Sequence, residues 1–259
     1  MNYPKITKII DTKSENPVVK TLFFEYDERI YPGQFFMIWI PGIDEIPMSV
    51  SYNQNKKKGI TFKKVGDATK ALFELEKNDH IGIRGPYGNG FHIEGNNPLF
   101  IGGGSGIATI TPAVKAFADK QIDSSVVLCA KNKNELFFEK RIKNYGSKVY
   151  VTTEDGSKGY KGLATDLAKK LISKNNYDSI ITCGPELMMK KLFHLSENIH
   201  FQASLERYMK CGFGICGQCC VGEGLRVCVE GPVFKGDILK NIKDFGVFKR
   251  DSSGSRIKF

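Results

Sequence analysis

Hydrophobic and polar positions divide the 259-residue chain into three stretches, and the first is rich in predicted strands. Runs of β-branched and aromatic residues alternate there with Pro-Gly turn signals at 32–33 and 41–42. The runs that predict strands are 18–24, 34–40 and 59–65. A short helix is expected at 67–75. Closely spaced strands separated by turns predict that residues 1–95 form a small antiparallel β-barrel.

The second stretch, residues 96–200, alternates apolar runs with amphipathic ones. Strands are expected at 98–102, 124–130, 147–152 and 178–183, and helices at 107–119, 134–144, 162–173 and 185–195. Repeated strand–helix units predict a doubly wound, parallel α/β sheet. Right-handed crossovers place the carboxyl ends of such strands along one edge, where ligands bind.

The third stretch, residues 201–259, loses this periodicity. It is rich in Gly and Cys up to about residue 245 and ends in a polar segment at 249–256. A segment with so little apolar pattern needs another source of stability, so we expect a small module held together by a metal centre. The polar segment is expected to be loosely ordered.

Composition narrows the classes of partner. The net charge of +10 would suit nucleic acid, but the lysines are scattered, and the one dense run, 56–58, reads as a solvated hairpin tip. No apolar stretch has the composition of a membrane span, because residues 95–114 are broken by glycines and prolines. The first residues carry no signal-peptide pattern, and four of the seven cysteines lie within 211–220. We therefore expect a cytoplasmic protein without nucleic-acid or membrane partners.

The cysteine cluster is the most specific chemical signal. Cys211, Cys216 and Cys219 have the C-x4-C-x2-C spacing of plant-type [2Fe–2S] sites, and Cys228 supplies a fourth thiolate. Glycines between these cysteines let a loop wrap closely around an inorganic core and aim backbone N–H groups at the sulfur atoms. The sequence predicts a [2Fe–2S] cluster on these four cysteines, with Cys220 as a non-ligand.

Two other interpretations of the cysteines stay open. Cys216 and Cys219 alone have the spacing of half a zinc knuckle, although Cys220 and Cys228 form a poor second half. Disulfides are the other alternative. A zinc-stabilised nucleotide-binding regulator without a redox role is therefore an alternative to an electron-transfer protein.

Two strand–helix junctions carry candidate nucleotide-binding residues. Gly102, Gly103, Gly104 and Gly106 lie where a strand ends and a helix begins, so a phosphate could approach the helix N-terminus. The alternative is a tight turn without a ligand. Cys183, Gly184 and Pro185 repeat the arrangement after the last strand of this stretch, and the alternative for Cys183 is a small buried apolar residue.

The order of these motifs resembles the ferredoxin–NADP reductase superfamily, and most closely its branch of electron-transfer subunits of type B dihydroorotate dehydrogenase. Residues 47–49 resemble the R-P-x-S flavin motif, and 85–88 resemble the G-P-x-G turn. Segments 206–216 and 228–234 resemble that branch specifically. The resemblance implies that FAD is bound in the barrel by Pro47, Met48, Ser49, Phe62, Lys63, Gly66, Ala68 and Thr69. It also places residues 183–185 near a nicotinamide.

The resemblance further implies a function. Electrons would pass from FMN in a dihydroorotate dehydrogenase catalytic subunit, through the [2Fe–2S] cluster and FAD, to NAD(H) as diffusible acceptor, in a complex with two copies of each subunit. No residue of this chain is then expected to act as a catalytic acid or base, because the substrate is oxidised on the partner. An electron-transfer subunit of a NADH-dependent ferredoxin:NADP oxidoreductase or of a hydrogenase is the alternative within this class.

Two positions depart from the family pattern. Ile46 stands where the family has an arginine that pairs with the flavin pyrophosphate, which should weaken binding unless Lys63, Lys64 or backbone N–H groups compensate. The interval between Cys219 and Cys228 is shorter than the branch leads us to expect.

Overall fold

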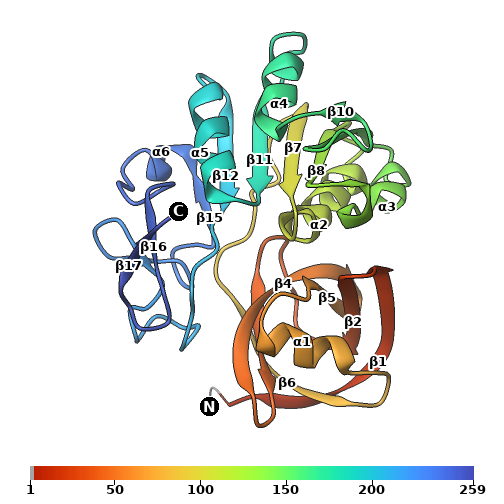
Figure 1. Cartoon of the computed structure of the whole chain (residues 1–259), viewed down its shortest axis with the longest axis vertical. Coiled ribbons are helices and arrows are strands. Elements are labelled where there is room, and N and C mark those ends of the chain that lie inside the picture. Colours follow the sequence, from red (N-terminus) through yellow and green to blue (C-terminus); the bar gives the residue numbers. More distant parts are fainter. Residues whose placement is uncertain (1–2) are drawn as a thin grey trace.

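The computed structural model describes residues 3–259, and its N-terminal part is a closed β-barrel (Figure 1). Six strands pair antiparallel in the order β1-β2-β5-β4-β3-β6. Their bounds are Lys5–Asn16 (β1), Val19–Glu25 (β2), Phe35–Ile40 (β3), Asp44–Gln54 (β4), Lys57–Lys63 (β5) and His80–Tyr87 (β6). Helix α1 (Asp67–Glu74) follows β5, and its Leu72 joins Phe24 and Phe36 in the barrel core. The predicted barrel is confirmed.

The lysine run at the tip of the β4–β5 hairpin is only partly solvated, contrary to the expectation from sequence. Lys56 is exposed, but Lys58 is 3% exposed. Its ammonium donates a hydrogen bond to Asn53 Oδ1 at 2.7 Å and another to the carbonyl oxygen of Asn55. Burial of Lys58 is possible because these two oxygens replace water around the charge.

The second part is a seven-stranded sheet in the order β10-β9-β8-β7-β11-β12-β15, parallel except for β15. Its strands are Pro98–Gly103 (β7), Ser125–Ala130 (β8), Lys148–Thr153 (β9), Tyr160–Lys161 (β10), Ser179–Cys183 (β11), His200–Ser204 (β12) and Val233–Lys235 (β15). The helices are Gly106–Asp119 (α2), Glu139–Lys143 (α3), Ala164–Ile172 (α4) and Glu186–Leu195 (α5). The predicted doubly wound fold is confirmed.

The two faces of this sheet are covered by different helices because side chains alternate along each strand. Leu99 and Ile101 of β7 pack in one core cluster with Ala168 of α4 and Leu192 of α5. Phe100 faces the other way and packs with α2 and α3. Helix α2 also contacts β4 and β5, so this face of the sheet lies toward the barrel.

The helix expected at 134–144 is broken into two. A 3-10 turn η1 (Lys133–Glu135) is followed by α3, and Phe138 between them has a left-handed backbone with φ +64°. Phe137 and Phe138 are both buried in the same core cluster. Adjacent residues of a continuous helix point in directions about 100° apart, so the break lets both rings reach one core.

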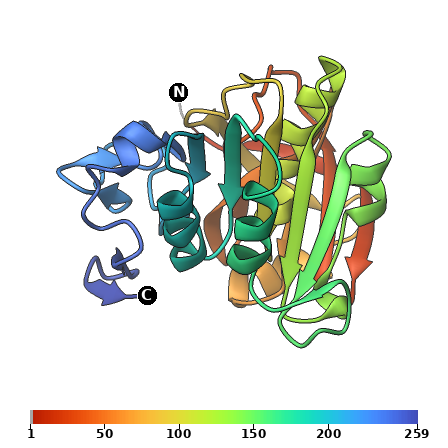
Figure 2. The same ribbon diagram turned by 90° about the horizontal axis from the view of Figure 1, so that it is seen from above.

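The C-terminal part lies beside the β12–β15 end of the sheet, as Figure 2 shows. It contains β13 (Cys220–Val221), β14 (Leu225–Arg226), α6 (Gly236–Leu239), β16 (Phe248–Arg250) and β17 (Arg256–Lys258). The segment 249–256 is therefore not loose but mostly part of a hairpin. The Asp251 carboxylate accepts the backbone N–H groups of Ser253 at 2.9 Å and Ser255 at 3.1 Å, which fixes its turn.

The boundary that we expected near residue 200 falls at a strand of the sheet. Strands β12 and β15, within 200–235, extend the parallel sheet by two strands beyond the predicted 96–200 segment. Over the described residues 3–259, no helix has the length and apolar character needed to cross a membrane.

Candidate redox and nucleotide sites

The four cysteines lie in one loop module between the barrel and β15. Cys219 and Cys228 are 2% exposed, Cys211 is half-buried and Cys216 is exposed. The backbone N–H groups of Ile215 and Cys216 donate to Cys211 Sγ at 3.4 Å and 3.5 Å. Burial acts to raise the pKa of the Cys211 thiol, but N–H donors from the following loop outweigh it and lower the pKa to about 6. This loop therefore favours a thiolate at position 211.

The four cysteines offer a donor set that suits a [2Fe–2S] cluster. In such a cluster two thiolates bind each iron, and sulfide completes the coordination. The N–H groups already aimed at Cys211 Sγ would stabilise its thiolate as a ligand. The cysteine loop with its aimed N–H groups fits this group.

Glycine allows the cluster loop to pack against the barrel. Gly212 has φ +77°, and a Cβ at this position would lie 2.6 Å from Cγ of Met37 in β3. Arg226 supports the same loop from the other side, because its Nη1 donates to the carbonyl oxygen of Gly214 at 2.9 Å. The loop is thus held between the barrel and β14.

A pocket of about 310 Å³ separates the barrel from the sheet. Six of the residues predicted for cofactor binding line it: Pro47, Met48, Ser49, Lys63, Thr69 and Cys183. Phe62 instead points into the barrel core, because its neighbours Thr61 and Lys63 in β5 face the pocket. Gly66 and Ala68 stand outside the lining. Gly66 is the N-cap of α1 and Ala68 packs against the barrel core.

The pocket has a second wall that sequence reasoning did not identify as a site. Its residues are Ser105, Thr109, Ser204, Leu205, Glu206, Arg207, Met209 and Pro232, with Phe35, Thr61 and Val65 added from the barrel. The largest contribution from one segment comes from the end of β12 and the residues that follow it, up to Met209. The sequence signal for this wall is the motif Glu206-Arg207-x-Met209-x-Cys211, which carries the family resemblance but does not by itself indicate a pocket.

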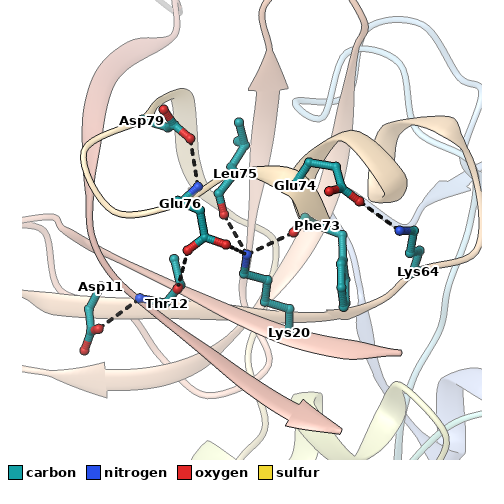
Figure 3. Close-up of polar contacts among 9 residues, drawn as sticks. All are labelled: Asp11, Thr12, Lys20, Lys64, Phe73, Glu74, Leu75, Glu76 and Asp79. Carbon is teal, nitrogen blue, oxygen red and sulfur yellow. Dashed lines mark hydrogen bonds and ion pairs between the residues drawn. The ribbon is translucent and has the colours of Figure 1, made fainter. Parts of the chain in front are cut away.

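Helix α1 is fixed at both ends beside this pocket. At its N-terminus, Thr69 Oγ1 accepts the N–H groups of Val65 and Gly66, both at 2.9 Å. At its C-terminus, Lys20 is 4% exposed and donates to the carbonyl oxygens of Phe73 and Leu75 at 2.9 Å and 2.8 Å (Figure 3). The same ammonium lies 2.7 Å from Glu76 Oε1. A buried cation that satisfies the last carbonyls holds the helix against β2.

Residue 46 is an isoleucine, so the barrel–sheet pocket lacks the arginine that the family has at this position. The side chain packs against the barrel core, and the residue pairs with Ile38 across β3 and β4. Two cationic side chains, Lys63 and Arg207, remain in the lining. Arg207 forms a buried ion pair with Glu186, which leaves Lys63 as the cation best placed to meet a ligand phosphate.

A second pocket, of about 360 Å³, lies at the carboxyl edge of the parallel sheet. Gly103, Gly104 and Pro185, three of the residues predicted to bind a nucleotide, line it, whereas Gly102 and Gly106 do not. Gly106 has a packing role, because a Cβ there would lie 2.1 Å from the carbonyl oxygen of Cys183. This close approach brings the start of α2 against the end of β11.

The two strand–helix junctions that were predicted to bind a nucleotide, residues 102–106 and 183–185, lie next to each other beside the barrel–sheet pocket. Gly184 lines a third hollow together with Gly103, Gly104, Glu206 and Phe259. Burial, followed by the nearby Glu206 carboxylate, raises the pKa of the Cys183 thiol. Cys183 is therefore a neutral, apolar wall of the pocket rather than a nucleophile. Burial likewise raises the pKa of Cys129, in the second pocket, to about 12.

These features define an electron-transfer oxidoreductase with the ferredoxin reductase fold: the barrel, the carboxyl edge of the parallel sheet with its glycines, and the cysteine loop. A solved ferredoxin reductase of carbazole 1,9a-dioxygenase shares this fold at a TM-score of 0.64, with 17% identity over 76% of this chain and 68% of that one. A solved NADH-dependent reduced ferredoxin-NADP oxidoreductase is more similar, with a TM-score of 0.81 and 29% identity over 93% of this chain and 94% of that chain.

Comparison with known sequences identifies the branch. Residues 206–240 match the iron-sulfur cluster binding domain of dihydroorotate dehydrogenase B, and residues 100–193 match the oxidoreductase NAD-binding domain. Proteins named as probable dihydroorotate dehydrogenase B (NAD(+)) electron transfer subunits are similar over nearly the whole length. The one from Methanocaldococcus jannaschii is 45% identical over 100% of both chains, and that from Thermoplasma volcanium is 43% identical over 97% of both. The chain belongs to the family of dihydroorotate dehydrogenase B electron transfer subunits.

Proposed function

We propose that this chain passes electrons from the FMN of a dihydroorotate-oxidising catalytic subunit, through a [2Fe–2S] cluster and FAD, to NAD. One observation carries the proposal: the segment Ser204–Met209 forms a wall of the barrel–sheet pocket and leads directly to Cys211. A flavin in that pocket and a cluster on the cysteine loop would be neighbours along the chain. The family membership supports the same arrangement.

We assign the flavin and the nicotinamide nucleotide to different pockets because different residues line them. The barrel–sheet pocket would hold the flavin ring, with Pro47 to Ser49 on one side and Cys183 on the other. Gly103, Gly104 and Pro185 would let the nicotinamide nucleotide pass along the carboxyl edge of the sheet. When bound, the flavin can exchange electrons singly with the cluster and in pairs with the nicotinamide. The chain's own residues position these groups and exclude water.

The exposed face of the cysteine loop is the proposed contact with the catalytic subunit. Ile215 is 78% exposed, and Phe213 and Val229 are exposed beside it. Exposed apolar side chains gathered on one loop are typical of an interaction surface. A partner bound there would bring its own cofactor close to the cysteines, as the proposed electron path requires. We propose an assembly with two copies of each subunit, in line with the family resemblance.

The test is the visible absorption spectrum of anaerobically purified protein, with flavin, iron and zinc measured on the same sample. We expect flavin bands with an iron–sulfur shoulder and about two irons per chain. A colourless sample with one zinc per chain would remove the redox function. If flavin and iron are found, co-purification identifies the partner. A dihydroorotate-oxidising subunit supports the proposal, and a ferredoxin:NADP oxidoreductase subunit contradicts it.

A further inference from the structure

One ion pair joins the barrel to the sheet at the place where their two pockets meet. Nζ of Lys63, the last residue of β5, lies 2.8 Å from Oε2 of Glu135 in the 3-10 turn η1. Lys63 lines both the barrel–sheet pocket and the pocket at the sheet edge, whereas Glu135 lines only the second. Their side chains are 31% and 23% exposed, so a ligand entering either pocket can reach the pair.

This ion pair is not needed to hold the two parts together. Arg141 of α3 already bridges them: its guanidinium lies 3.4 Å from the centre of the Tyr52 ring, and Nη2 donates to the carbonyl oxygen of Ser51 at 2.8 Å. Both partners belong to β4 of the barrel. The Tyr52 ring also packs edge-on against Phe138. Because this contact is extensive and partly buried, changes at Lys63 or Glu135 should leave the arrangement of the barrel and sheet intact.

The two charges have opposite effects on an anionic ligand. The Lys63 ammonium attracts the phosphates of a dinucleotide. The Glu135 carboxylate already forms an ion pair with this ammonium, however, and it adds a negative charge to the pocket at the sheet edge. Lys131, Lys191 and Glu154 are the other charged side chains of that lining. A partly exposed ion pair is weak, so a phosphate oxygen can replace the carboxylate as the partner of the lysine.

We propose that Lys63 serves phosphates in both pockets, and that Glu135 is the internal anion with which a nicotinamide dinucleotide competes for it. Glu135 therefore weakens nucleotide binding and favours release of the nucleotide once electrons have been transferred. The inference rests on the proposed function and deepens it, because it assigns a binding residue that serves both cofactors and a residue that sets the affinity for one of them.

The experiment is a calorimetric titration of purified, flavin-loaded protein with NADH, in low salt and again in high salt. We expect Glu135→Gln to tighten NADH binding on the order of three- to tenfold in low salt and by less in high salt. Lys63→Met should weaken NADH binding and also lower the flavin content.

The matched control is Glu139→Gln, because Glu139 pairs with Lys143 at 2.8 Å and Lys158 at 2.6 Å outside both pocket linings. This variant should bind NADH as the wild type does.

The outcomes separate this inference from the proposed function. If the wild type binds NADH and Glu135→Gln binds it equally or more weakly, the competition is wrong while the proposed function stands. Unchanged NADH binding in Lys63→Met would overturn the shared role of the lysine. If the wild type binds no NADH, the nucleotide assignment fails, and this inference fails with it. Should Lys63→Met be recovered without flavin, the Glu135→Gln titration still decides.

Discussion

The Arg207 guanidinium forms a two-pronged ion pair with the Glu186 carboxylate, and both side chains are almost completely buried. Nη2 of Arg207 donates to Oε1 at 2.8 Å, and the same oxygen accepts the backbone N–H of Gly246 at 2.8 Å. The pair connects the wall of the barrel–sheet pocket to the first turn of α5. It fixes the segment that leads to the cysteine loop.

Removing one member of this pair should be costly. We expect Arg207→Met to lower the free energy of unfolding by about 3–5 kcal/mol, because the Glu186 charge would stay buried without its partner. Urea denaturation measures this. The double variant with Glu186→Met should recover most of the loss. A control is Lys115→Met, whose exposed pair with Asp119 lies along α2 and should change stability by less than about 1 kcal/mol. Equal effects of the two single variants would contradict the importance of burial.

Lys20 should contribute more to stability than the neighbouring Lys64, although both pair with a glutamate near the end of α1 (Figure 3). Lys20→Met would leave the carbonyl oxygens of Phe73 and Leu75 without their donor, at a cost of about 2–3 kcal/mol. Lys64 is exposed, so Lys64→Met should cost under about 1 kcal/mol. Thermal unfolding of both variants tests the difference, and similar melting temperatures would show that burial of Lys20 contributes little.

The cysteine assignment predicts different outcomes for two neighbouring positions. Cys211→Ser should abolish iron binding and leave the flavin in place, because the proposed flavin pocket is formed by other residues. Cys220→Ser should keep about two irons per chain. Iron analysis and the visible spectrum measure both. Retention of iron in Cys211→Ser, or its loss in Cys220→Ser, would require a different ligand set.

Close packing at Gly212 can be separated from backbone strain. Gly212→Ala places a Cβ 2.6 Å from Met37 Cγ at φ +77°. Gly146→Ala introduces a similar strain at φ +85°, with nothing within 4 Å of the new Cβ. Strain alone costs about 1 kcal/mol. We therefore expect the Gly212 variant to lose more stability and to release iron faster on incubation with a chelator. Equal losses would mean that the loop moves away from the barrel freely.

Local patterns were sufficient to predict much of the fold. The barrel was predicted from short β-rich runs in 1–95, and the parallel α/β sheet from strand–helix alternation in 96–200. Both signals depend only on residues that are close in sequence. Phe62 shows the limit, because a period of two predicts that Thr61 and Lys63 share a face but not which face meets the pocket. The break at Phe138 depended on a core that the local pattern does not reveal.

The sequence indicates candidate site residues where they lie close together along the chain. The cysteine spacing lies within one loop, and the glycines of the nucleotide edge lie within one turn. By contrast, Glu206 and Arg207 join the pocket from a strand end more than a hundred residues beyond the barrel, and Lys63 meets Glu135 across 72 positions. Such contacts arise from the packing of the barrel on the sheet, which no local pattern specifies.

The short segment after β12 has a consequence for motion within the molecule. Met209 lines the barrel–sheet pocket and Cys211 follows it by two residues, so their α-carbons are separated by at most about 7.6 Å. This covalent link of two residues limits how far Cys211 can move from the wall of the pocket that Met209 forms. The cysteine loop and that wall must therefore move together, whatever other parts of the molecule shift when a nucleotide binds or leaves.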